Sequence, residues 1–189
     1  MNRRQILKYT AMLTGTAICA PLTGMMLSGC SQQVTEVSTS YSSLAFFSSE
    51  DFKVITQIMD VILPKTDSPS ASEVKVNYIL DNMFDQVYQS DYQQKFTDNF
   101  KQLKSFLVSN NFDTLTNKER ETLLLSIESL SDNQRNNVYW AYIDIKQQTV
   151  AFYLSTEEIA KNHLNYLPIP GEYKPCVSLE DLGGKAWAI

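Results

Sequence analysis

Few side chains in this 189-residue chain could carry out chemistry, and their spacing matches no known active site. The only histidine is His163, whereas a zinc site needs three or four ligands. The haem attachment motif C-x-x-C-H and the G-x-S-x-G motif of serine hydrolases are both absent. We therefore expect His163 to be a surface or packing residue. We predict no catalytic, cofactor-binding or metal site in this chain.

Three aspartates are the remaining candidates for acid–base chemistry. Asp60 lies in one predicted helix, and Asp81 and Asp85 lie at i, i+4 spacing on one face of the next. This pair could act as two catalytic carboxylates, but we favour a solvated acidic face. We also expect the aromatic side chains of the longest predicted helix to form core rather than a cofactor box; they are Tyr139, Trp140, Tyr142, Phe152 and Tyr153.

Glycine usage and charge exclude two further classes of function. No glycine occurs between Cys30 and Gly171, so this stretch has no Gly-rich loop that could bind a phosphate or a dinucleotide. The net charge is −5, and it becomes −8 without the first thirty residues, which hold three basic residues and no acidic ones. Because nucleic-acid binding needs a basic face, we do not expect it here.

The first thirty residues are typical of an export signal. Basic residues precede an apolar run that extends from about Tyr9 to Gly29. Arg3 and Arg4, with Ile6-Leu7-Lys8 behind them, resemble the twin-arginine motif, whose route carries proteins that are already folded. An ordinary basic n-region is the alternative. The weakly apolar run and the trailing lysine favour the twin-arginine interpretation.

The apolar run ends in Leu27-Ser28-Gly29-Cys30, which resembles the lipobox of bacterial lipoproteins. In that class the cysteine is acylated and the chain is cut just before it. We therefore predict a signal peptide over residues 1–29 and a lipidated flexible tether over residues 30–47, which is rich in Ser, Thr and Gln. An uncleaved membrane anchor is the alternative, since the run is close to the length of a spanning helix.

One cysteine is left once the signal is removed and Cys30 is lipidated. Cys19 leaves with the signal, and Cys176 lies near the C-terminus. An odd cysteine in an oxidising compartment suggests a disulfide to another chain or a buried free thiol. Both interpretations of Cys176 stay open.

Apolar residues at helical spacing predict an all-α fold, with a single compact domain of about five to six helices over residues 48–164. Cap chemistry at Ser48 and the capping box Thr116–Glu119 mark two helix starts, and Pro64 ends the first helix. Apolar groups surround much of the fifth helix, which we expect to be central. The predicted helices cover about residues 48–63, 72–88, 90–107, 116–127, 133–154 and 155–164.

Residues 165–189 differ from the rest in composition. Three of the six prolines and the last three glycines of the chain occur there, which predicts an extended tail without a core of its own. Because such a tail has no core of its own, it must pack against another surface, and we predict that it binds a partner. The candidate interface residues are Tyr166, Pro168, Pro170, Gly171, Tyr173 and Trp187.

Two segments resemble the gluconate 2-dehydrogenase subunit 3 family. Residues 59–71, Met-Asp-Val-Ile-Leu-Pro-Lys-Thr-Asp-Ser-Pro-Ser-Ala, are similar to its D-x-I-I-P-x-T-D-T-P-G-A segment, with Ser70 in place of the usual Gly. Residues 166–173 are similar to its Y-x-P-x-P-G-x-Y stretch, and the twin-arginine start matches as well. The lipobox is not a general feature of the family.

The resemblance implies a small, non-catalytic subunit of a periplasmic, membrane-bound sugar, sugar-acid or polyol dehydrogenase. In that family a larger subunit of the glucose-methanol-choline type holds FAD and oxidises the substrate. A multihaem cytochrome c subunit often passes electrons to quinone. The small subunit supports folding and export of the flavin subunit, which lacks its own signal.

We therefore predict an all-α lipoprotein that escorts the flavin subunit through twin-arginine export and holds it at the periplasmic side of a bacterial membrane. A stand-alone helical lipoprotein with a binding or structural role is the alternative, and an enzyme in its own right is the least favoured. Ser31 after Cys30 favours the outer membrane, whereas a quinone-linked role favours the inner one.

Overall fold

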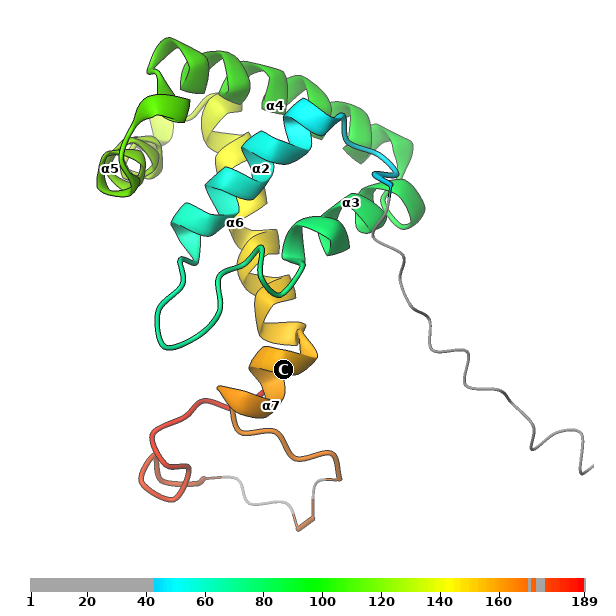
Figure 1. Ribbon diagram of the computed structural model, residues 1–189, viewed down its shortest axis with the longest axis vertical. Coiled ribbons are helices and arrows are strands. Elements are labelled where there is room, and N and C mark those ends of the chain that lie inside the picture. The colour runs from blue at the N-terminus through cyan, green and yellow to red at the C-terminus, as the bar shows by residue number, and fades with distance from the viewer. Residues whose placement is uncertain (1–42, 170, 173–175, 189) are drawn as a thin grey trace, which may run out of the picture. The chain divides into compact units, whose positions relative to one another are not determined.

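The computed structural model describes residues 43–169, 171–172 and 176–188. Arg3, Arg4 and Cys30 lie outside these residues, so the export and lipidation motifs stay predictions. The described chain is helical, without a β-strand (Figure 1). Its helices are α2 (Ser49–Ile62), α3 (Val76–Gln86), α4 (Ser90–Ser109), α5 (Asn117–Glu128), α6 (Asn137–Ser155) and α7 (Glu157–Asn162), with short 3-10 turns η1 (Phe112–Thr114) and η2 (Asp132–Gln134). The predicted all-α fold is confirmed.

Side-chain caps fix several helix starts at the predicted positions. The Ser48 hydroxyl accepts a hydrogen bond from the Asp51 amide at 3.1 Å, and the Thr116–Glu119 capping box is formed. Each cap provides a partner for backbone N–H groups that have none within the first turn. These local rules explain why α2 and α5 begin where the sequence predicts.

Two helices begin later than predicted. The second starts at Val76 rather than Ser72, because Lys75 adopts a left-handed conformation with φ 64° and so cannot continue a helix. The fifth starts at Asn137 rather than Asn133, because the Asn136 side chain accepts the amides of Val138 and Tyr139 as an N-cap.

Helix α6 occupies the centre of the fold, as predicted, and packs against α2, α3, α4, α5 and α7. Its Ile145 and Thr149 are fully buried, and the Thr149 hydroxyl donates to the Ile145 carbonyl at 2.6 Å. Tyr139, Tyr142 and Tyr153 lie in the core, which confirms most of the predicted aromatic set. Trp140 is the exception, because half of its surface is exposed.

Asp81 is buried, so the predicted solvated acidic face is wrong at this position. It is 2% exposed, and its carboxylate accepts the backbone amides of Ala45, Phe46 and Phe47 at 2.6, 3.1 and 2.8 Å. Asp85 is exposed as expected. The two carboxylates therefore do not form a catalytic pair.

The amides that Asp81 accepts lead into a cluster of aromatic rings. The Phe46 and Phe47 rings lie 5.2 and 5.0 Å from the Phe84 ring, and Phe96 lies 4.5 Å from it. Residues 45–47 are thus fixed by hydrogen bonds on the backbone and by packing on the side chains. Among the described residues, no helix has the length and apolar character to cross a membrane.

Candidate docking surface

The loop between α2 and α3 is held by side chains from α2 and α6. The Asp60 carboxylate at the end of α2 accepts the Ser72 amide at 2.9 Å and the Ser72 hydroxyl at 2.7 Å. The hydroxyl of Tyr153 on α6 bonds to the Ser68 hydroxyl at 2.9 Å and donates to the Pro69 carbonyl at 2.7 Å. This loop, which contains the 59–71 motif, therefore has a defined shape although it lacks regular secondary structure.

Glu73 stabilises the same loop through contacts with other loop residues. Its carboxylate accepts the Lys65 ammonium at 2.6 Å and the Ser70 amide at 2.9 Å. These two hydrogen bonds hold the pKa of Glu73 below its usual value. Glu73 is thus ionised at neutral pH, and it links both ends of the loop.

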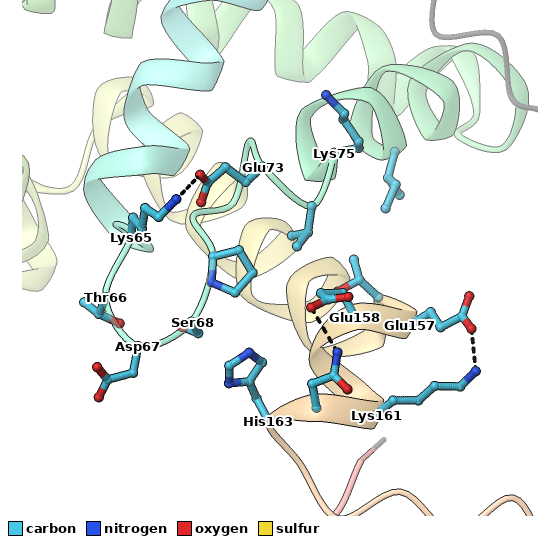
Figure 2. Close-up of a pocket in the computed structure, with 15 residues that line it drawn as sticks. Lys65, Thr66, Asp67, Ser68, Glu73, Lys75, Glu157, Glu158, Lys161 and His163 are labelled. Atoms are coloured by element: carbon cyan, nitrogen blue, oxygen red, sulfur yellow. Dashed lines mark hydrogen bonds and ion pairs between the residues drawn. The ribbon is translucent and has the colours of Figure 1, made fainter.

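A groove of about 960 Å³ lies between this loop and α7. Figure 2 shows Ser68 on the loop, His163 at the end of α7, and Asp67 directed away from the loop. Lysine and acidic side chains both line it, and Lys65–Glu73 and Lys161–Glu157 are ion pairs. The rest of its lining is formed by Thr66, Pro69, Val74, Lys75, Ile79, Thr156, Glu158 and Asn162.

The groove is lined by charged side chains and by one histidine. His163 is partly buried and lines the groove, whereas the sequence indicated only a surface or packing role. In the part of the chain that the structure describes, no cluster of three or more His, Cys, Asp or Glu residues could hold a metal ion. Charged pairs that already satisfy each other are suited to contacts with a polar protein surface.

The C-terminal segment (residues 165–188) carries the other predicted interface. Tyr166 is 48% and Trp187 49% exposed, and Pro168 and Gly171 are exposed as well. Pro170 and Tyr173 lie outside the described residues. Several further apolar side chains of this segment are exposed, namely Leu167, Ile169, Val177 and Leu179.

The C-terminal segment is not a freely extended tail. It turns over residues 179–184 and returns to Asn165, which forms an isolated parallel bridge with Trp187. The sequence analysis did not predict this return, because a single asparagine between a helix and a proline-rich stretch is compatible with many backbone conformations. The signal that could have indicated a turn was the pair Gly183-Gly184, which adopts φ of 60° and 75°.

Cys176 is a free, exposed thiol in this structure. A buried free thiol was one of its two predicted states, and the exposed position contradicts it. The second state, a disulfide to another chain, stays a prediction. An exposed position is what such a disulfide would need.

A comparison with protein families identifies the chain. The model for gluconate 2-dehydrogenase subunit 3 matches residues 49–171, which is well over half of the 189 residues. The chain belongs to this family. No curated protein and no solved structure matches it.

The family match covers all six described helices, the loop and the groove. Membership of the gluconate 2-dehydrogenase subunit 3 family makes the chain an accessory subunit of gluconate 2-dehydrogenase-like enzymes, associated with their catalytic complex. The match ends at Gly171, so Cys176 and Trp187 lie beyond it.

Proposed function

We propose that this chain is the non-catalytic small subunit of a periplasmic FAD-dependent dehydrogenase of the glucose-methanol-choline type, which oxidises a sugar, sugar acid or polyol. It binds the flavin subunit, escorts it through twin-arginine export and anchors it to the membrane. The observation that carries the proposal is the family match over the whole helical body. The prebuilt groove and the exposed apolar C-terminal segment support it, because both are available to a partner.

In this proposal the redox groups belong to the partners. FAD is bound by the catalytic subunit, and haem c by a cytochrome subunit where one is present. Between Cys30 and Gly171 this chain has no glycine, so it lacks the loops in which backbone amides approach a dinucleotide phosphate. The chain therefore contributes a binding surface, an export signal and a membrane anchor.

The escort function is tested by changing Arg3 and Arg4 together to Lys. We expect the flavin subunit to stay in the cytoplasm, because it would have no export signal of its own. The measurement is the flavin-dependent dehydrogenase activity of the periplasmic and cytoplasmic fractions. Undiminished periplasmic activity would refute the escort function.

The lipid anchor is tested with Cys30→Ser, for which Cys19→Ser is a matched control within the predicted signal peptide. The acidic charge of the chain offers no attraction to anionic lipid, so the acyl chains have to provide the membrane affinity. We expect the Cys30 variant to leave the membrane fraction and the Cys19 variant to stay. Two variants that both stay membrane-bound would contradict lipidation and favour an uncleaved anchor.

Cys176 is proposed to form a disulfide with the catalytic subunit. A non-reducing gel of the native complex should show a band at the summed mass, and Cys176→Ser should abolish that band. A band at the mass of this chain alone would argue against the disulfide. The escort and anchor functions would be unaffected by that result.

The stand-alone lipoprotein is the rival hypothesis. It predicts that the chain, solubilised from its native membrane, carries no flavin. Visible flavin absorbance that elutes with the chain supports the accessory subunit, and its absence supports the rival.

A further inference from the structure

Helix α6 carries apolar side chains on two opposite sides, and the monomer fully buries only one of them. The buried side includes Tyr142, Ile145 and Tyr153, which lie in the core. A helix that is apolar all round is normally covered all round, because apolar surface left in water costs free energy. The opposite side of α6 is therefore a surface that the monomer leaves incompletely covered.

This open side consists of five residues, which we call the α6 seam: Trp140, Ile143, Gln147, Val150 and Leu154. Trp140 is 50% exposed, Gln147 is exposed, and the other three are partly buried. Because successive members are three or four residues apart, they follow one face of the helix for about 21 Å. This spacing fits the side chains of a second α-helix, so the missing cover is helical.

The middle position of the α6 seam is polar. Gln147 is exposed, whereas the neighbouring Gln148 bonds to the hydroxyls of Tyr88 and Tyr92 at 2.6 and 2.8 Å within the monomer. One polar residue in an otherwise apolar seam fixes the register of two helices, because a shifted register would leave its amide against apolar side chains. Gln147 thus requires a polar side chain opposite it.

The charged groups beside the α6 seam indicate a cationic partner. Asp144 is partly buried at one edge, and its carboxylate forms no ion pair within the part of the chain that the structure describes. The charge of Lys95 acts on it only through space. Lys146 at the other edge is already paired with Glu128 at 2.6 Å. A Lys or Arg on the partner, opposite Asp144, would complete this pattern of charges.

A second copy of this chain and a lipid surface fit the α6 seam less well. Two copies would each carry the net charge of −8 that remains without the first thirty residues, and like charges oppose association. Helices that lie on a lipid surface are rich in Lys and Arg on their polar face. The one basic residue of α6 is Lys146, which Glu128 already neutralises.

We propose that the α6 seam is the docking site for one amphipathic α-helix of the flavin subunit. That helix has an apolar stripe with matching spacing, a polar side chain opposite Gln147 and a Lys or Arg opposite Asp144. Trp140 is the main anchor, because a large exposed aromatic side chain gains the most from burial in an interface. The inference rests on the proposed function and adds the surface and the kind of element that it binds.

The first test compares Gln147→Glu with Gln102→Glu, both in the full-length chain with an affinity tag after Ser38, solubilised from native membranes. The two residues are exposed on α6 and α4, and Gln and Glu have similar helix propensity. We expect neither variant to change the melting temperature. In Gln147→Glu the flavin that elutes with the tagged chain should fall at least roughly tenfold, because a carboxylate would be buried in the seam. Gln102→Glu should retain wild-type flavin.

The second test identifies the occupant directly. The photoreactive residue benzoylphenylalanine takes the place of Trp140 in one tagged chain and of Gln102 in another, and intact membranes are irradiated. We expect a covalent product from position 140 at the summed mass of this chain and the flavin subunit. Mass spectrometry should identify the flavin subunit in that product and place the cross-link in a helix of it. Position 102 should give no such product.

Each outcome decides between the hypotheses. A wild-type chain that elutes without flavin refutes the proposed function itself. If the wild-type chain carries flavin, then full recovery in Gln147→Glu, an equal loss in Gln102→Glu or no product from position 140 refutes only the role of the α6 seam. A lowered melting temperature of Gln147→Glu would show that the monomer already covers the seam. A product at twice the mass of this chain, or an adduct with phospholipid, would overturn the assignment of the partner.

Discussion

The helical body (residues 43–164) and the C-terminal segment place their apolar side chains in opposite environments. Phe84, Leu80 and Ile145 have no exposed surface in the body, whereas Ile169 and Leu179 in the segment are mostly exposed. The body is held together by burial around α6, and the segment by hydrogen bonds to Asn165. Stability thus rests on the body, and we propose that partner binding rests on the segment and on the α6 seam.

This division has a physical reason. A side chain that is buried in the monomer cannot contribute burial energy to a complex, because that surface has already left the water. The body uses most of its large apolar groups for folding. The C-terminal segment leaves such groups exposed, which a protein without a partner rarely does.

The largest expected effect contrasts an aromatic ring in each region. Phe84→Ala should lower the free energy of unfolding by about 3 to 5 kcal/mol, because the Phe46, Phe47 and Phe96 rings would face a cavity. Trp187→Ala should change it by less than about 0.5 kcal/mol, as is usual for exposed sites. Urea unfolding followed by circular dichroism measures both. Equal losses would show that the segment belongs to the core.

Asp81→Asn tests the buried carboxylate. The neutral amide provides one acceptor oxygen and turns its NH2 group toward backbone donors, so we expect a loss of about 2 to 3 kcal/mol. The matched control is Asp85→Asn, one turn away and exposed, with an expected change below about 0.5 kcal/mol. Similar values for the two variants in urea unfolding would contradict the anchoring of residues 45–47 by Asp81.

Alkaline pH should destabilise the body through Tyr142. Burial, with a smaller contribution from the charge of Glu128, raises the pKa of Tyr142 from 10.0 to about 12. Below pH 10 this hydroxyl is protonated in both the folded and the unfolded chain and adds no pH dependence. Between pH 10 and 12 only the unfolded chain loses the proton, so the free energy of unfolding falls as pH rises.

Tyr142→Phe should remove roughly 1 to 2 kcal/mol of that decline. The control is Tyr166→Phe in the C-terminal segment, whose side chain is half exposed and should leave the decline in place. Unfolding curves at a series of pH values between about 9 and 12 measure the slope. A slope that Tyr142→Phe leaves unchanged would contradict the role of burial at this residue.

The smallest expected effect concerns the loop that carries the 59–71 motif. Tyr153→Phe removes hydrogen bonds to Ser68 and Pro69 and should cost about 1 kcal/mol. Trypsin cleavage after Lys65 should become faster, because the loop opens more often. Tyr166→Phe is again the control, since Tyr166 is half exposed and lies outside this loop. Equal cleavage rates in the two variants would show that the loop holds its shape without α6.

Local signals in the sequence predicted most of the helical body. Ser48, the Thr116–Glu119 box and Pro64 act within a turn of their own position, so their effect can be predicted without knowledge of the fold. The left-handed conformation of Lys75 was not predicted, because no glycine lies near this position to indicate it. The burial of Asp81 could have been predicted, since Asn77, Leu80, Asp81 and Phe84 share one helical face, and all four are buried.

The sequence indicated separate segments of the candidate docking surface, but it did not predict the groove that they form together with α7. The motif at residues 59–71 and the apolar residues of the C-terminal segment stood out in the sequence. The groove depends on the approach of α7 to a loop that lies about ninety residues earlier in the chain. No local pattern encodes that approach.

The sequence by itself determined the helical class and the family, because periodicity, caps and short motifs act over a few positions. The signals in the first thirty residues stay predictions. The tertiary structure decided which polar groups are buried and which apolar groups are free. Asp81 is an anchor because backbone amides from residues 45–47 converge on it. The Asn165 side chain bonds to the carbonyls of Leu182 and Lys185, which only the folded chain brings within reach of its amide.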